Sequence, residues 1–219
     1  MKNLINKFLF ATFFTLFLGF SHAKAELQVV TSIKPIHSLA SLLMDGIGTP
    51  KLIVDGSNSP HNFTLKPSHA KMLQNADLVF WVGEDIETFL EKPLGTVAKK
   101  AKKIELMEIS QLKKLKFREK NIFEGHDDHG HGKKDDHGHA HGEHDPHVWL
   151  DPLNAKVILK VMAKNMKIMD KKNSAKYAAN LKKANAKIAG LVSEINKVIK
   201  KNAKYVVFHD AYQYFEKRF

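Results

Sequence analysis

The sequence predicts an α/β protein of two lobes, in which parallel strands alternate with helices and one long rigid helix joins the lobes. Short runs of β-branched and aromatic residues alternate with amphipathic segments over residues 27–106, which is typical of a parallel sheet covered on both faces. A long amphipathic segment follows, and a strand-like run resumes beyond it. We therefore expect a first lobe over residues 26–171, a linking helix over 172–202 and the start of a second lobe over 203–219.

Residues 1–25 have the composition of an export signal. Two lysines precede an apolar run from Phe8 to Phe20, which is shorter than a comfortable membrane span. Ala23-Lys24-Ala25 fits the small-x-small pattern of a cleavage site, so we expect the mature protein to begin at Glu26 and to be exported. The alternative is an uncleaved membrane anchor.

Composition limits what the exported chain can bind. It has no cysteine, so any metal site must be built from histidines and carboxylates. The formal charge is +12, but the lysines are spread along helical faces without interleaved aromatic residues, which indicates a solvated basic surface and no nucleic-acid partner. No apolar run after the leader is long enough for stable membrane insertion.

The first lobe opens with a β-rich run at Leu27–Ser32. The apolar residues of Ile36–Ile47 recur at helical spacing, and the glycine and proline of residues 48–50 end that predicted helix. A second buried strand follows at Lys51–Val54. Residues 55–60 are rich in Gly, Ser, Asn and Pro, which predicts a loop that leads to His61.

The alternation continues to the end of the sheet. Further elements are predicted as a helix over Pro67–Asn75, a strand over Leu78–Trp81, a helix around Ile86–Glu91 and a strand over Lys103–Leu106.

Two helices follow the sheet, over Asn154–Met169 with Pro152 at its start and from Asn173 or Ser174 to about Lys201. Apolar residues of the second helix are spaced alternately four and three apart, which fits half of a coiled coil or a spine between two lobes. The strand-like run at Tyr205–Phe208 favours the spine.

A final helix is predicted over Tyr212–Phe219. One strand and one short helix cannot bury a core of their own, so either the second lobe is largely missing from this sequence or Phe219 packs back on the first lobe. We expect the former.

Asn121–Asp151 holds eight of the thirteen histidines. Seven of them lie among glycines, acidic residues, lysines and alanines, which predicts a solvated loop over residues 124–144 that binds zinc weakly and mainly one histidine at a time. The alternative is a plain linker. We hypothesise that the tract collects scarce zinc or buffers plentiful zinc, and unchanged zinc uptake after deletion of residues 124–144 would contradict that role. The tract histidines are His126, His129, His131, His137, His139, His141 and His144.

Three other histidines are candidate ligands of a tight site. His147 stands between two prolines, His61 follows a strand by a loop, and His209 directly follows a predicted strand. Ligands collect beyond the carboxyl ends of strands in open α/β sheets, and three imidazoles with a fourth ligand suit tetrahedral Zn²⁺. Each of the three could instead cap a backbone group or lie on the surface. His37 and His69 lie on predicted helices, and we expect them at the surface or behind the ligands.

Several motifs together resemble a known family. They are Ser59-Pro-His61, Leu65–Ser68, Leu73–Val79, Asp145–Pro152 and Phe208–Phe215. They are similar to the first part of the cluster A-I periplasmic binding proteins, and among these to the zinc-binding components of high-affinity zinc ABC importers. The resemblance runs from the leader to the last residue, with the histidine-rich insertion in the family's usual place.

The resemblance implies two βα lobes, one metal ion in the cleft between them and transfer of that ion to a membrane permease. By motif it implies His61, His147 and His209 as ligands. Manganese-binding relatives typically carry glutamate at the position of His209, so histidine there indicates zinc, as does the preference of nitrogen donors. Pro60 replaces a glutamate ligand of some zinc members, and the acidic ligand from the second lobe has no counterpart here, which leaves water or an outside carboxylate for the fourth position.

The leading interpretation is therefore a periplasmic, monomeric zinc-binding protein without enzymatic activity. A zinc hydrolase is a second class, with Asp151 or Asp210 nearest to act as general base, and zinc-dependent turnover of an ester or CO₂ would support it. A third is an exported buffering or adhesion protein that acts through the tract, whose zinc capacity would survive loss of the three candidate ligands. In either binding interpretation, zinc affinity falls below about pH 6 as imidazoles protonate.

Overall fold

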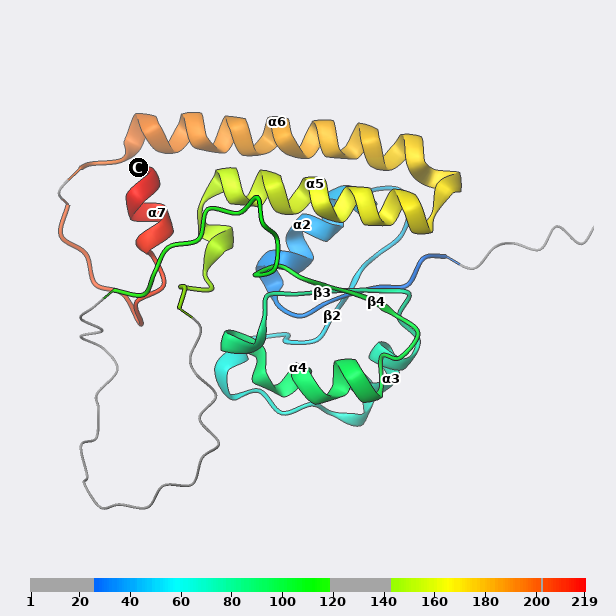
Figure 1. Ribbon diagram of the computed structural model, residues 1–219. Helices are drawn as coiled ribbons and strands as arrows, with labels where there is room; N and C mark the ends of the chain where they lie inside the picture. The colour runs from blue at the N-terminus through cyan, green and yellow to red at the C-terminus, as the bar shows by residue number, and fades with distance from the viewer. Residues whose placement is uncertain (1–25, 119–142, 202) are drawn as a thin grey trace, which may run out of the picture.

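The computed structural model describes residues 26–118, 143–201 and 203–219 (Figure 1). Its centre is a sheet of four parallel strands in the order β2-β1-β3-β4. The register pairs Val30 with Lys51 on one side and with Val79 on the other. The four strands predicted in the first lobe are confirmed, three of them with different bounds: they are β1 (Val29–Thr31), β2 (Lys51–Leu52), β3 (Leu78–Trp81) and β4 (Lys102–Glu105).

Helices cover both faces of this sheet. One face carries α2, α5 and α6, and the opposite face carries α3 and α4 (Figure 1). Within the three described ranges, no helix is both long and apolar enough to cross a bilayer. The helices are α2 (Lys34–Met44), α3 (Pro67–Gln74), α4 (Glu84–Thr96), α5 (Pro152–Met169), α6 (Ser174–Val198) and α7 (Gln213–Arg218), with single 3₁₀ turns at η1 (Pro60–Asn62), η2 (Val148–Leu150) and η3 (Lys171–Asn173).

Prolines mark where three of these helices begin. Pro35, Pro67 and Pro152 lie in the first turns of α2, α3 and α5, where a missing backbone N–H costs no helical hydrogen bond. Asp151 caps α5, because its Oδ1 accepts a hydrogen bond of 2.9 Å from the amide of Leu153. The turn just before α5 is therefore rigid.

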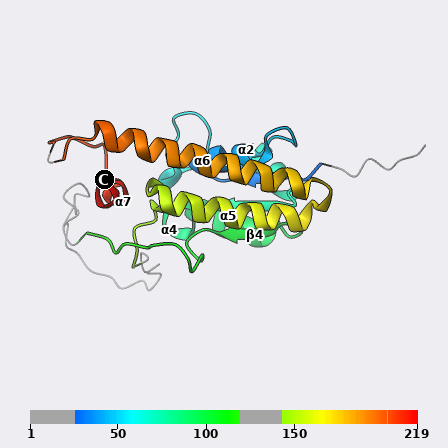
Figure 2. The same ribbon diagram turned by 90° about the horizontal axis from the view of Figure 1, so that it is seen from above.

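The long helix α6 packs on the first lobe along its first part. Tyr177, Ala184 and Ile188 are buried there, whereas Leu191 and Val198 nearer its end are 50% and 75% exposed. Figure 2 shows α5 and α6 side by side above the sheet. The apolar stripe of α6 thus completes the first lobe's core, and its role as a link to a second lobe stays a prediction.

The strand predicted at Tyr205–Phe208 is wrong. These residues form no strand, and Val206 and Phe208 are 95% and 99% exposed. A run of β-branched and aromatic residues forms a strand only when a neighbouring strand pairs with its backbone hydrogen-bonding groups. Among the described residues the sheet consists of β1 to β4, and none of these pairs with this segment.

The last helix packs back against the first lobe. The sequence offers such packing, through Phe219, as the alternative to a largely missing second lobe, and the observed contacts do not contradict a missing lobe. In α7, Gln213 and Tyr214 are buried against the segment that leads to η2. The helix that the sequence predicts over residues 212–219 is confirmed with slightly shorter bounds. Its contacts lie beside the candidate site.

Candidate metal centre

Three histidines from distant parts of the chain meet at one end of the sheet. One ring nitrogen each of His61, His147 and His209 lies within 4.8 Å of those of the other two. Nε2 of His147 and Nε2 of His209 lie 3.2 Å apart. Zn–N distances of about 2.0–2.1 Å place the nitrogens of a tetrahedral site about 3.3–3.4 Å apart. The cluster is therefore close to the size that a zinc ion requires.

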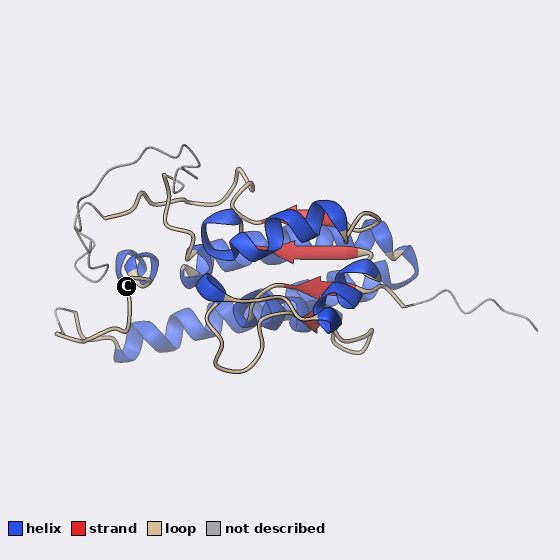
Figure 3. Cartoon of the chain, turned by 90° about the horizontal axis from the view of Figure 1, so that it is seen from below, coloured by secondary structure: helices blue, strands red, loops and turns tan. Residues whose placement is uncertain are grey.

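Topology explains this meeting. The strand arrows in Figure 3 point towards the end of the molecule where α7 and the C-terminus lie. His61 lies in η1 beyond the carboxyl end of β2, and His147 and His209 come from loops next to η2 and α7. In an open parallel sheet this edge is where loops converge and ligands bind.

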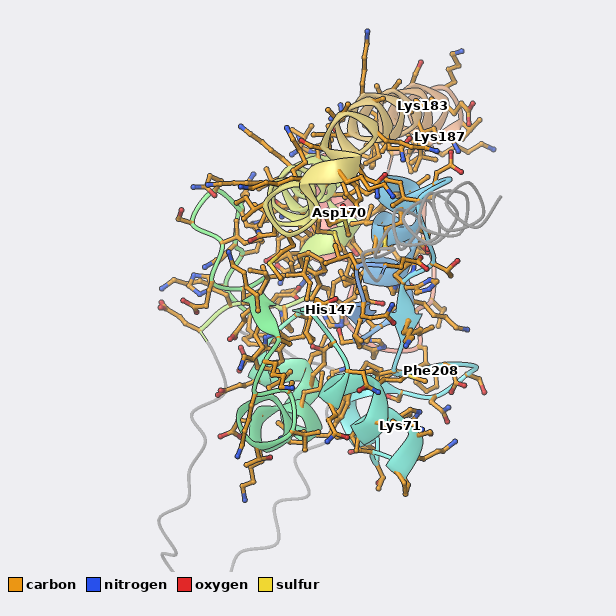
Figure 4. The ribbon with its side chains drawn as sticks, turned by 90° about the vertical axis from the view of Figure 1, so that its right-hand side faces the viewer. Lys71, His147, Asp170, Lys183, Lys187 and Phe208 are labelled. Carbon is orange, nitrogen blue, oxygen red and sulfur yellow. The ribbon has the colours of Figure 1, made fainter. Side chains whose placement is uncertain are left out.

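His147 is the buried member of the cluster. It is 7% exposed, and Figure 4 shows it between the helices above and below it. Oδ1 of Asp145 lies 2.7 Å from Nδ1 of its ring and also accepts its backbone N–H at 2.9 Å. The ring of Trp149 lies 5.3 Å away, centre to centre. A carboxylate at Nδ1 favours the tautomer with its proton there, which leaves Nε2 free to face the other two imidazoles.

His61 is held through its neighbours. Its backbone N–H donates to Oγ of Ser59 at 3.3 Å, which caps η1. Two residues later, the ring of Phe63 lies 5.1 Å from that of Phe89 on α4 and 5.4 Å from that of His69 on α3. Phe63 therefore anchors the exposed η1 turn to both helices of the lower layer.

Two further histidines, His37 on α2 and His69 on α3, lie outside the cluster. His69 was expected at the surface or behind the ligands, and it is 5% exposed, so the surface alternative is wrong. Its Nδ1 accepts the backbone N–H of Lys66 at 3.1 Å. Burial, and then the nearby charge of Lys66, lower the pKa of the His69 imidazole, which favours its neutral form. His37 is half-buried, with Nε2 3.1 Å from the carbonyl oxygen of Pro50.

α7 supports the site from behind. Gln213 Nε2 donates to Oδ2 of Asp145 at 2.6 Å, and the Tyr214 hydroxyl donates to the carbonyl oxygen of Asp145 at 2.7 Å. The same hydroxyl accepts the amide of Leu115 at 2.9 Å. Burial is the largest of the effects that raise the pKa of Tyr214 to about 12, so the hydroxyl keeps its proton at neutral pH.

Sequence analysis missed these supports, as it missed Phe63. Gln213 and Tyr214 lie 68 and 69 residues from Asp145, and no local pattern links them. The only sequence signal was their place inside the last of the motifs that resemble the periplasmic binding family.

The carboxylates nearest to the histidines are already engaged. Arg218 donates to both oxygens of Asp151, at 2.8 and 2.6 Å, and Asp210 pairs with Arg118 at 3.4 Å. Asp145 is occupied by His147 and Gln213. Among the described residues, the metal-ligand cluster consists of three imidazoles.

Most of the histidine tract lies outside the described residues. This holds for His126, His129, His131, His137, His139 and His141. The tract's last histidine, His144, is described and is not one of the cluster's members. Its backbone pairs with Lys116 in an isolated antiparallel bridge, three residues before His147.

Comparison with known proteins gives consistent relatives. The family model described as zinc-uptake complex component A, periplasmic, matches residues 29–219. The high-affinity zinc uptake system protein ZnuA of Brucella abortus (strain 2308) is 43% identical over an alignment that covers the whole chain and 72% of that protein. ZnuA of Yersinia pestis is 35% identical, over 89% of this chain and 64% of that protein.

Solved structures show the same fold at lower identity. A crystal structure of ZnuA superposes with a TM-score of 0.69 at 21% identity, over 88% of this chain and 68% of that one. Zn(II)-bound AdcA of Streptococcus pneumoniae gives 0.65 at 21% identity, over 87% of this chain and 37% of that one. The chain thus spans about two thirds of the ZnuA structure that it matches.

Proposed function

The chain belongs to the family of periplasmic zinc-uptake components, and from this membership we propose that it captures Zn²⁺ and delivers it to the membrane permease of an ABC importer. The observation that carries the proposal is the convergence of three imidazole nitrogens within 4.8 Å. Such a protein needs affinity, selectivity and release, and no bond chemistry.

His61, His147 and His209 are the proposed zinc ligands. Neutral imidazole nitrogen is a good donor for Zn²⁺, whereas Mn²⁺ prefers carboxylate and carbonyl oxygens. A site of three imidazoles therefore favours zinc. The fourth position is taken by water or by a carboxylate from outside the described residues, because Asp151 and Asp210 are held in ion pairs with arginines.

The remaining parts of the chain receive roles by the same proposal. Residues 1–25 direct export to the periplasm, 26–171 form the first lobe, 172–202 link the lobes and 203–219 begin the second. The protein acts as a monomer. The tract over residues 124–144 supplies weak sites that collect or buffer zinc beside the tight site, a role supported by the bridge that ties His144 next to it.

The hydrolase alternative finds less support in this geometry. A general base must reach the metal-bound water with a free carboxylate. Asp151 and Asp210, the two candidates from the sequence, are paired with Arg218 and Arg118. Asp145 faces away from the ring nitrogen that would bind the metal, because it bonds Nδ1.

A competitive zinc titration tests the proposed ligands. The chain is used without residues 124–142, so that the tract does not mask the tight site, and His147→Ala is compared with His37→Ala. We expect one tight site per chain and a loss of affinity of about 100-fold or more in His147→Ala, equivalent to about 2.8 kcal/mol. His37→Ala is the matched control, since its half-buried ring also bonds a neighbour but lies outside the cluster. Equal losses in both variants, or none in His147→Ala, would contradict the proposal.

A further inference from the structure

We propose that α7 is the common support of two of the three histidines, with Gln213 and Tyr214 as positioning residues that act on His147 through Asp145. This role rests on the proposed zinc site, and it makes α7 the helix that controls the rate at which zinc dissociates from that site. It assigns a task to two buried side chains that bond Asp145, the carboxylate behind the His147 ring.

The first support runs through Asp145. This residue is 2% exposed, and three of its oxygen contacts fix it: Oδ1 to Nδ1 of His147, Oδ2 to Nε2 of Gln213 and the carbonyl oxygen to the Tyr214 hydroxyl. The carboxylate can orient the His147 ring only while it is itself held. Loss of a group that bonds a ligand histidine, as Asp145 bonds His147, typically lowers metal affinity 10–100-fold.

The second support concerns His209. The segment before it is exposed and forms no helix or strand, with Val206 95% and Phe208 99% exposed, and Phe208 lies near the edge of the molecule in Figure 4. Burial begins only after the histidine, at Ala211, whose amide donates to the carbonyl oxygen of His209 at 3.0 Å. The backbone of His209 is therefore linked to the buried residue that leads into α7.

Both supports end in one short helix. Arg218 ties the far end of α7 to Asp151, at the start of α5, and Arg118 reaches Glu216 in the middle of α7 at 2.5 Å. A shift of α7 away from the first lobe would release the carboxylate behind His147 and move His209 at the same time. Loss of two ligands in one motion opens a three-imidazole site far more than loss of either one alone.

The test measures zinc dissociation after addition of excess strong chelator. Tyr214→Phe removes the hydroxyl that joins Asp145 to Leu115 and keeps the ring, and Gln213→Leu removes the amide at a similar size. Tyr212→Phe is the matched control, because it deletes the same atom from an exposed tyrosine two residues earlier. We expect zinc to leave about 10-fold faster from each of the first two variants and at the wild-type rate from the control.

Two further readouts separate positioning from general loosening. Cobalt(II) absorption bands report ligand geometry, so they should shift in Tyr214→Phe and Gln213→Leu and stay unchanged in Tyr212→Phe. The effects of Gln213→Leu and Asp145→Asn on dissociation should also be strongly non-additive, because both act through one carboxylate. If one α7 variant fails to fold, as judged by thermal unfolding, the other decides.

The outcomes distinguish this inference from the proposed function. Tight zinc binding by the wild type, together with unchanged dissociation and cobalt spectra in the α7 variants, would overturn the role of α7 and leave the importer proposal intact. Absence of a tight site in the wild type, or a tight site that survives His147→Ala, would overturn both.

Discussion

Glu87 is a buried acidic residue near the end of the sheet where the histidines lie. It is fully buried at the start of α4, with the irregular backbone angles φ −125° and ψ 46°, and its Oε2 accepts the amide of Val82 at 2.7 Å. Among the described residues its other oxygen, Oε1, has no hydrogen-bond partner. Burial is the main cause that raises the pKa of Glu87 from 4.5 to about 7. The folded protein therefore holds this proton more tightly than the unfolded chain does.

Replacement of Glu87 tests this directly. Because the folded-state pKa is raised, the free energy of unfolding falls as pH increases from about 4.5 to about 7, by at most about 1.4 kcal/mol per pH unit, and stays lowered above that range. Glu87→Gln cannot ionise, so we expect it to flatten this pH dependence and to be more stable than the wild type at pH 8. Urea unfolding at pH 5, 6, 7 and 8 measures both effects.

Glu105 provides the matched control. Burial, followed by neighbouring carboxylates, raises the pKa of this half-exposed residue to about 7 as well. Solvent weakens such effects at exposed groups, so Glu105→Gln should flatten the curve less than Glu87→Gln. If the free energy of unfolding of Glu87→Gln depended on pH as that of the wild type does, ionisation of the Glu87 carboxyl would not be the cause of this dependence.

At the scale of secondary-structure elements, a buried asparagine of α6 bonds the end of α2. Asn180 is 3% exposed, and its Nδ2 donates to the carbonyl oxygens of Leu43 at 2.8 Å and Asp45 at 2.9 Å. These two carbonyls belong to the end of α2, where helical partners run out. The side chain of Asn180 on α6 therefore caps the C-terminal end of α2.

We expect Asn180→Ala to lower the free energy of unfolding by about 1–3 kcal/mol, because it leaves buried carbonyl groups without a donor. Asn196→Ala is the control on the same helix. Its Nδ2 bonds the carbonyl oxygen of Val192 within α6 at an exposed position, so its loss should cost no more than about 0.5 kcal/mol. Denaturant unfolding of both variants gives the comparison, and equal losses would refute this account of helix docking.

Helices and strands that depend on neighbouring residues in the sequence can be predicted from it. Those that depend on contacts with distant residues cannot. Pro35, Pro67 and Pro152 lie in the first turns of their helices and mark where these begin. The strand β3 has the bounds that the sequence predicts. The strand expected at residues 205–208 does not form, since a β-rich composition is local but strand pairing depends on a neighbour elsewhere in the chain. The sequence favours a missing second lobe over packing of the chain's last residues on the first lobe. The packing of α7 escapes it for the same reason, because the partners of α7 lie some 70 residues earlier.

At the scale of the whole molecule, the topology of the parallel sheet brings the three histidines together. His61, His147 and His209 are separated by 86 and 62 residues, yet a parallel sheet sends its strand ends to one edge, and the loops that carry the histidines meet there. The sequence therefore names the three residues that the structure brings together, although the strand from which it places His209 does not form. It did not find the network of Asp145, Gln213 and Tyr214 behind them, because that network depends on how α7 packs.

The proposal that His61, His147 and His209 bind zinc is tested most directly by zinc K-edge X-ray absorption. The sample is the chain without residues 124–142, loaded with one equivalent of Zn²⁺. Removal of these residues takes away six tract histidines that would otherwise add to the signal. We expect a four-coordinate ion with three imidazoles at about 2.0–2.1 Å and one oxygen, and two imidazoles in His147→Ala. A six-coordinate, oxygen-rich shell, or a spectrum that His147→Ala leaves unchanged, would contradict it.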